Sequence, residues 1–255
     1  KTFILLEKIW NFIFPFDKEN WDLITSASEE VKEKFISAFR STENAVKVTG
    51  YPRYDILLNY DVNRKTSQYL KRYNNKKIIL YAPTFRDGNI DYNYFTDLNK
   101  NELNLLMIKT NSIFIVKLHP KSNKIKFSEE QYSNLEFINN EILDINIILS
   151  KTDILITDYS SIYIDFLLFN KPIIFTPFDF KNYIENNKNL YYDYYEITPG
   201  KKCNSWDDTL KEIKEIFNGN DHFSLNRKNI KTMYHKYADT NNCSRITNRI
   251  KNKYE

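Results

Sequence analysis

Glycine and cysteine are scarce in this chain of 255 residues, and each shortage excludes a class of site. The chain has four glycines and neither a G-x-G-x-x-G nor a G-x-x-x-x-G-K-[ST] sequence, which excludes the glycine-rich phosphate loops of dinucleotide-binding and P-loop proteins. Its two cysteines, Cys203 and Cys243, are too few and too far apart for a disulfide framework or a zinc site. We therefore expect two free thiols in a reducing compartment.

The chain also lacks a strong net charge and a long apolar run. Its formal charge is +4 and its lysines are scattered, so nucleic acid is not indicated as a partner, although a weak preference for anionic surfaces stays open. No run reaches the roughly 18 apolar residues that a membrane-spanning helix needs. The segment from Phe3 to Phe16 is apolar and aromatic but is interrupted by Glu7, Lys8 and Asn11, so a core helix and an interfacial membrane contact both remain open.

What the chain does contain is an alternation of short apolar runs with helical patterns. The predicted strands are 22–25, 46–49, 77–81, 112–117, 135–138, 154–157 and 173–175. The predicted helices are 26–40 (with Ser26 and Glu29 as a capping box), 66–73, 101–108, 142–149, 162–169, 206–217 and a C-terminal segment from about 223. This order predicts an α/β fold with a doubly wound parallel sheet.

The segment 153–183 is the clearest single unit, reading as strand, polar turn, helix and strand. Ser160 and Ser161 lie at the predicted helix start, where hydroxyls and unpaired backbone amides stabilise an anion such as phosphate. Asp165 lies one helical turn later and would accept a hydrogen bond from a sugar or polyol hydroxyl. The alternative is that both serines only cap the helix and that Asp165 is solvated.

Polar side chains follow three of the predicted strands: Thr84 and Arg86, then His119, then Ser160 with Ser161. Because the carboxyl ends of parallel strands meet at one edge of a sheet, we expect these groups to converge. A guanidinium, an imidazole and hydroxyls together suit a diphosphate, and Arg53 would join them from a preceding lobe. The alternatives are that Arg86 forms a solvated ion pair and that His119 lies in a core or a turn.

Several segments together resemble the CDP-glycerol glycerophosphotransferase family, which comprises wall teichoic acid polymerases and related capsule polymerases. They are TGYPRYD (49–55), YAPTFR (81–86), KLHP (117–120), DYSS (158–161) with Asp165, PIIF (172–175), FD (178–179) and HKYAD (235–239) followed by Arg245. The resemblance covers the chain from about Trp21 to the C-terminus. The order and spacing of the motifs make it specific.

The resemblance implies a GT-B type, glycosyltransferase-like fold with an essentially complete C-terminal lobe and a truncated N-terminal lobe. Residues 1–55 would be the tail of an incomplete N-terminal Rossmann-like lobe, and 56–235 the C-terminal lobe that binds the nucleotide donor. Residues 236–255 would form a helix that packs back toward the N-terminal lobe. Family members carry a His-Gly motif resembling a general base in the N-terminal lobe, whereas this chain has no histidine before His119, so we expect the fragment to lack that base.

The resemblance also implies an activity, in which a polyol phosphate of the glycerol- or ribitol-phosphate type passes from a CDP-activated donor to a polymer hydroxyl. The acceptor hydroxyl would attack the β-phosphorus and CMP would leave. His119 is the expected catalytic residue, binding the phosphate or protonating the leaving group. The expected donor-binding residues are Arg53, Thr84, Phe85, Arg86, Lys117, Leu118, Ser160, Ser161 and Asp165.

The expected partners follow from that activity. They are a CDP-polyol and a growing teichoic-acid-like or capsular polymer or lipid-linked saccharide, and nucleic acid is not among them. We expect no metal ligands and no cofactor besides the donor substrate, while a need for a divalent metal stays open. A cytoplasmic location follows, with peripheral contact to the inner face of the membrane left open. Two alternatives remain: a GT-B glycosyltransferase that uses a nucleotide sugar, and a non-catalytic nucleotide-binding module of a capsule synthesis protein.

Overall fold

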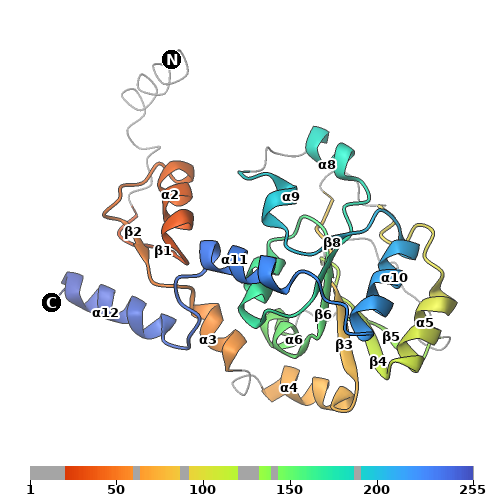
Figure 1. Cartoon of the computed structure of the whole chain (residues 1–255). Helices are drawn as coiled ribbons and strands as arrows, with labels where there is room; N and C mark the ends of the chain where they lie inside the picture. Colours follow the sequence, from red (N-terminus) through yellow and green to blue (C-terminus); the bar gives the residue numbers. More distant parts are fainter. Residues whose placement is uncertain are drawn as a thin grey trace. The chain divides into compact units, whose positions relative to one another are not determined.

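The computed structural model describes residues 21–59, 64–86, 92–119, 132–138, 143–186 and 191–254. The apolar segment 3–16 and most of the polar loop after His119 lie outside these residues. The chain divides into two compact units, which we call the terminal unit (residues 1–55 and 233–255) and the central unit (residues 56–232). Figure 1 shows the terminal unit in the red-orange and dark blue ends of the colour scale.

The central unit is built on a six-stranded sheet in which every pairing is parallel. Its order is β5–β4–β3–β6–β7–β8, with β3 at Lys77–Tyr81, β4 at Ser112–Val116, β5 at Leu135–Phe137, β6 at Ile154–Thr157, β7 at Ile173–Phe175 and β8 at Lys201–Lys202. The order places β3 between β4 and β6, so three successive loops leave neighbouring strands at the same edge. The predicted α/β fold with a parallel sheet is confirmed.

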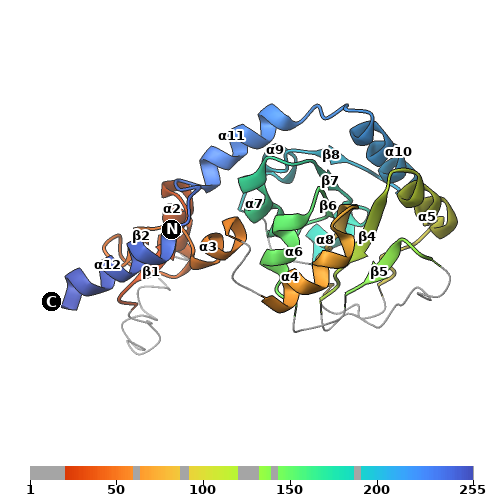
Figure 2. The same ribbon diagram turned by 90° about the horizontal axis from the view of Figure 1, so that it is seen from below.

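Helices cover both faces of this sheet (Figures 1 and 2). The central unit contains α4 (Arg64–Leu70), η3 (Lys71–Tyr73), α5 (Lys100–Lys109), α6 (Ile145–Lys151), α7 (Ile162–Phe166), η4 (Leu167–Phe169), α8 (Phe180–Asn186), α9 (Tyr194–Ile197), α10 (Trp206–Phe217) and most of α11 (Ser224–Tyr234). On one face Met107 of α5 and Trp206 of α10 pack with Phe114 of β4 in one hydrophobic core. Because both faces are covered, the inner strands are continuous apolar runs rather than alternating ones.

One local prediction differs from the structure for a physical reason. The predicted capping box at Ser26 is wrong, because Ser26 ends strand β1 and Ser28 caps α2 (Glu29–Ala38) by accepting a hydrogen bond from Val31 N at 3.2 Å. A further helix that the sequence did not predict, α3 (Pro52–Leu58), begins at the proline. Proline suits the first helical position because its missing N–H has no partner there.

In the terminal unit, β1 (Ile24–Ser26) and β2 (Val46–Val48) form a parallel pair connected through α2. The Asp55 carboxylate caps α12 (Asn242–Tyr254) by accepting from the backbone N–H groups of Asn242 at 2.9 Å and Cys243 at 2.8 Å. Gly50, at φ +75°, leaves room for Asn242, whose Oδ1 would lie 1.8 Å from a Cβ at position 50. The Arg245 guanidinium donates to Thr49 O at 2.9 Å. The two family motifs at 49–55 and 235–245 therefore hold one another in place.

Two further observations concern the described residues only. None of their helices combines the length and the apolar character needed to cross a membrane. Both thiols are free, as expected, with Cys203 buried and Cys243 exposed.

We predict that Asp55→Ala lowers the free energy of unfolding by about 1–2 kcal/mol, because the first amides of α12 lose their acceptor. Burial raises the pKa of Asp55, but hydrogen bonds from Cys243 and Asn242 outweigh it and the pKa lies below its usual value. A depressed folded-state pKa stabilises the protein above the unfolded-state pKa of about 4, and this contribution is lost as the pH falls. Urea denaturation at several pH values measures both effects. Exposed Glu33→Ala is the control, and equal losses in the two variants would contradict the capping role.

Candidate functional site

The loops that follow β3, β4 and β6 come together at the carboxyl edge of the sheet. The Phe85 and His119 rings, from the first two loops, lie 5.0 Å apart between centroids. Thr84 N donates to Asp158 Oδ1 at 2.7 Å, which joins the first loop to the third. The predicted convergence of these loops is therefore present in the structure.

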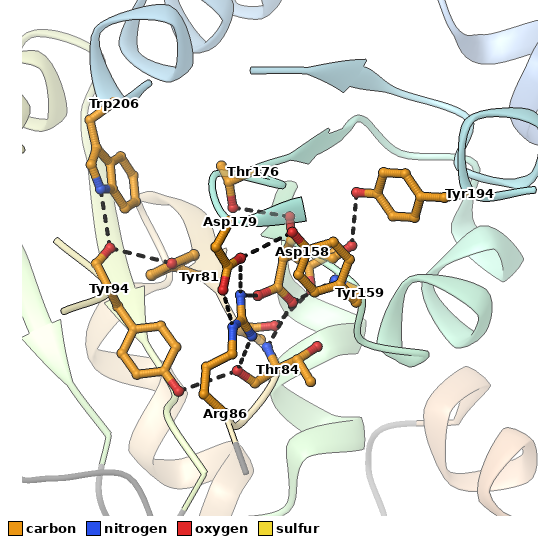
Figure 3. Close-up of polar contacts among 12 residues, drawn as sticks. Tyr81, Thr84, Arg86, Tyr94, Asp158, Tyr159, Thr176, Asp179, Tyr194 and Trp206 are labelled. Atoms are coloured by element: carbon orange, nitrogen blue, oxygen red, sulfur yellow. Dashed lines mark hydrogen bonds and ion pairs between the residues drawn. The ribbon is translucent and has the colours of Figure 1, made fainter. Parts of the chain in front are cut away.

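A buried ion network holds this edge together (Figure 3). The Arg86 guanidinium donates to both carboxylate oxygens of Asp179, at 2.7 Å and 2.9 Å, and to Asp158 Oδ2 at 2.7 Å. Its remaining nitrogen donates to Thr84 O at 2.6 Å. Arg86 is 6% exposed and Asp158 1% exposed. The network thus ties the loops after β3, β6 and β7 to one another without solvent between them.

Aromatic rings surround the guanidinium. Its Cζ lies 4.8 Å from the ring centroid of Tyr92, 5.0 Å from that of Tyr159 and 5.4 Å from that of Tyr183. Tyr159 stacks on Tyr183 and donates to Asp179 Oδ1 at 3.0 Å. Electron-rich ring faces favour a cation, and here they replace the water that Arg86 would otherwise have.

The ionisation of these groups follows from burial and charge. Burial lowers the pKa of Arg86, but hydrogen bonds and charges from Asp179 and Asp158 outweigh it and hold the pKa well above its usual value. Burial and the nearby Asp179 carboxylate raise the pKa of Tyr159 well above its usual range, and that of Tyr92 to about 12. At neutral pH the guanidinium is therefore charged and the phenols are neutral hydrogen-bond donors.

Arg86 therefore has partners other than those expected for it. The alternative of a solvated ion pair is wrong, because the side chain is buried. In place of a phosphate, Nε and both terminal nitrogens already bond to Asp158, Asp179 and Thr84 O. The structure thus shows Arg86 as a group that joins the loops.

The backbone of Thr84 is hydrogen-bonded, whereas its side-chain hydroxyl is not. Its carbonyl accepts from Tyr94 Oη at 3.2 Å as well as from Arg86, and its amide bonds to Asp158. Thr84 Oγ1 is buried and has no hydrogen-bond partner among the described residues. A buried hydroxyl without a partner at this edge keeps its capacity to bond a ligand.

The loop after β4 carries His119 in an exposed position, with its ring tilted by 32° against Phe85. Lys117 is half-buried, and its backbone N–H donates to Tyr81 O at 2.9 Å, which extends the β3–β4 ladder by one bond. The Leu118 side chain belongs to the hydrophobic core. Any contact of Leu118 with a ligand would therefore have to come from its backbone. The alternative of a core position for His119 is wrong.

The serines after β6 do little capping. Ser161 is the N-cap of α7 but its side chain makes no capping hydrogen bond, and Ser160 Oγ accepts from Ile162 N only at a long 3.4 Å. Ser161 is exposed, and Ser160 and Asp165 are half-buried. The hydroxyls thus lie at the sheet edge with most of their hydrogen-bonding capacity not spent on the helix.

Arg53 belongs to the terminal unit, where it lies on α3 with its guanidinium 4.4 Å from the Tyr51 ring centroid. Its expected contact with the donor stays a prediction.

Reasoning from the sequence did not assign roles to Asp158 and Asp179, the two carboxylates that fix Arg86. Asp158 directly follows β6 and Asp179 lies in the loop after β7, and both lie within segments that resemble the family. Acidic residues at the carboxyl ends of neighbouring strands, next to an arginine loop, are the signal that indicates such a network. Within the described ranges, no three histidine, cysteine or carboxylate side chains group closely enough to hold a metal ion.

We predict that Asp179→Ala lowers the free energy of unfolding by about 3 kcal/mol, because it leaves a buried guanidinium with one carboxylate instead of two. The matched control is Lys211→Ala, which breaks an exposed ion pair with Asp208 and should cost less than about 0.5 kcal/mol. Urea denaturation of both variants makes the comparison. Similar losses would show that the network contributes no more than a surface pair.

Comparisons with known proteins give the family of this chain. The model of the CDP-glycerol:poly(glycerophosphate) glycerophosphotransferase family matches residues 11–252. The teichoic acid glycerol-phosphate primase of Bacillus subtilis (strain 168) is 33% identical over 237 residues, which are 91% of this chain and 58% of that protein. The teichoic acid poly(ribitol-phosphate) polymerase of Bacillus spizizenii is 32% identical over 203 residues, 77% of this chain and 32% of that protein.

A solved structure of the wall teichoic acid polymerase TagF matches with a TM-score of 0.77 at 23% identity, covering 91% of this chain and 58% of that one. This likeness shows the fold. The chain thus spans between about a third and three fifths of the length of these three proteins. From the family match and the identity to the primase, the chain belongs to the CDP-glycerol:poly(glycerophosphate) glycerophosphotransferase family.

Proposed function

We propose that the central unit is the donor-binding part of a transferase that moves a polyol phosphate from a CDP-activated donor to a hydroxyl of a teichoic-acid-like polymer, releasing CMP. One observation carries the proposal: in a chain of this family, the loops after three neighbouring parallel strands bring residues with hydroxyl, imidazole and ammonium side chains to one sheet edge. Because the chain spans only part of its relatives, the complete reaction is a property proposed for the whole protein.

The donor phosphates need positive charge and hydrogen-bond donors, and the ion network does not supply them. With one guanidinium and two carboxylates, the network has a formal charge of −1. We therefore assign the phosphates to the exposed side of the edge, against Lys117, His119 and the hydroxyls of Ser160 and Ser161. There, donors fixed before the reaction would stabilise the charge on the transferring phosphoryl group.

His119 is the proposed catalytic residue. When the acceptor hydroxyl attacks the β-phosphorus, the bond to the CMP oxygen breaks and that oxygen takes up negative charge. An imidazole N–H at this point would bond to the leaving oxygen and protonate it. The Phe85 ring 5.0 Å away limits how the imidazole can turn. This sequence has no histidine before His119, so no residue of that kind and place can serve as the general base for the acceptor hydroxyl.

The remaining expected residues have supporting roles. Asp165 would accept a hydrogen bond from a polyol hydroxyl, and Thr84 Oγ1 would bond the donor at the inner side of the edge. Arg53 would contribute from the terminal unit. Arg86 acts through position, since it holds the loops that carry these groups. The proposed acceptor is a growing polymer or a lipid-linked saccharide, which places the working protein at the inner face of the membrane.

We predict that the chain binds CDP-glycerol more tightly than UDP-glucose and that His119→Ala weakens the binding of CDP-glycerol by about 10- to 100-fold. A hydrogen bond to a charged phosphate contributes roughly 1.5–3 kcal/mol, which gives that factor. Isothermal titration calorimetry measures both. The control is His222→Ala, which removes an exposed histidine from the turn before α11 and should leave the affinity unchanged.

Two results would contradict the proposal. Preference for the UDP sugar would assign the edge to a nucleotide-sugar glycosyltransferase. Binding of CDP-glycerol with equal affinity in the His119→Ala and unmodified chains would remove His119 from the site. Transfer of glycerol phosphate by the whole protein, measured with the same pair of variants, separates a loss of binding from a loss of turnover.

A further inference from the structure

A groove with a volume of about 590 Å³ lies where the strands of the central sheet begin. The loops after β3, β4 and β6, which we call the donor loops, lie at the other end of the strands. We call it the amino-edge groove and define it by Lys71, Lys76, Lys77, Lys151 and Asp153. Lys77 is the first residue of β3 and Asp153 directly precedes β6, so the groove lies where parallel strands begin. In Figure 1, α4 lies below this end of the sheet, and α8 and α9 lie toward the other end. Five residues of β3 separate the two edges by about 16 Å.

Positive charge dominates the groove. Asp153 is the one acidic residue among its lining side chains in the described part of the chain, against four lysines. The Asp153 carboxylate is already shared: Oδ2 accepts from Ile78 N at 2.9 Å, and Oδ1 lies 3.5 Å from Lys77 Nζ and 4.0 Å from Lys171 Nζ. Burial, together with the charges of Lys77 and Lys151, lowers the pKa of Lys171 despite Asp153. A bound anion would relieve this crowding of cations.

The uncharged lining also contains groups that bond hydroxyls. Ser67 contributes a hydroxyl, and Asn74 and Asn75 contribute amides. The Thr110 hydroxyl and Asn111 Nδ2 also line the groove but bond within the protein, to Leu106 O at 2.8 Å and Asn75 O at 2.6 Å. Lysine ammonium groups bind phosphates as compact point charges, whereas amides and hydroxyls exchange hydrogen bonds with alcohols. The lining therefore suits a ligand that carries both phosphates and hydroxyls along its length.

We propose that the amino-edge groove binds a poly(polyol phosphate) chain, at a site separate from the donor loops. This proposal rests on the proposed function, because such a chain is the product of that reaction. A polymer held there stays near the donor site between additions, which raises its effective concentration. Since every added unit brings one more phosphate, occupancy of the groove would favour longer chains.

Two other polyanions fit the groove less well. Single-stranded nucleic acid gains much of its affinity by stacking on exposed aromatic rings, but the aromatic side chain of the lining, Tyr73, is 8% exposed. A membrane surface is bound by inserting apolar side chains among the lipids, but the apolar lining residues Leu70 and Ile78 are buried. With either partner, the amide and hydroxyl groups of the lining would form few hydrogen bonds.

The test is isothermal titration calorimetry of the full chain with a short synthetic poly(glycerol phosphate) oligomer. The groove variant is Lys71→Gln with Lys77→Gln, both of them exposed lysines. The control variant is Lys211→Gln with Lys228→Gln, exposed lysines on α10 and α11 that change the net charge equally. We expect the groove variant to bind the oligomer about tenfold more weakly and the control variant to bind it as the unmodified chain does. Equal thermal unfolding of the variants confirms that folding is intact.

Three outcomes would overturn the proposal: no binding of the oligomer, equal weakening in both variants, or binding to phosphatidylglycerol vesicles alone that the groove variant loses. A parallel titration with CDP-glycerol keeps the two proposals apart, and we expect the groove variant to leave it unchanged. If the chain binds CDP-glycerol but the groove variant binds the oligomer as well as the unmodified chain does, the groove proposal is wrong and the proposed function stands. The reverse result would leave a polyanion site and remove the proposed donor.

Discussion

The bidentate contact between Arg86 and Asp179, extended to Asp158, is the interaction on which the carboxyl edge of the central sheet depends. Among the described residues, the loops after β3, β6 and β7 have few backbone bonds to one another beyond the ends of the strands, so a side-chain network sets their spacing. Placing a guanidinium in the interior is costly unless every donor is used, and here two carboxylates, a carbonyl and several tyrosine rings meet that need. Because the hydrogen bonds of this network form only when the loops keep their spacing, the network fixes the loop after β3 and the loop after β6. The first carries Phe85, which lies beside His119, and the second carries Ser160 and Ser161.

The same reasoning applies to the motifs by which the chain resembles its family. Some of their residues hold the fold rather than face a substrate. In the terminal unit, Gly50 makes room for Asn242, Asp55 caps α12, and Arg245 bonds to Thr49 O. In the central unit, Leu118 fills the core beside an exposed His119. A motif therefore contains residues with different roles. The position of each side chain in the structure shows whether it stabilises the fold or is exposed where a ligand could bind.

How far the sequence predicts this structure depends on how local each interaction is. The strands at 77–81, 112–116, 154–157 and 173–175 were predictable, because strands covered on both faces are continuous apolar runs. Strand β8 was not, since Lys201 and Lys202 are charged and the strand is placed by Gly200, whose missing Cβ would lie 2.1 Å from Ile173 O. Ser26 and Ser28 offer nearly the same capping signal, and only the pairing of β1 with β2 decides between them. The partners of Arg86 lie 72 and 93 residues away along the chain, so spacing could place it at the edge but could not say what it bonds there.

The charge of the network finally limits where a donor can bind. A cluster of one guanidinium and two carboxylates, shielded from water, repels a diphosphate that comes close to it. In the proposed donor complex the phosphates therefore lie on the side of the β4 loop with Lys117 and His119 and of the exposed Ser161. The amino-edge groove shows the contrasting case, in which four lysines and one carboxylate line the same groove. One parallel sheet thus has a buried ion network at the carboxyl ends of its strands and a cationic groove at their amino ends, which suits the proposed binding of a small activated donor and a long anionic polymer at separate sites.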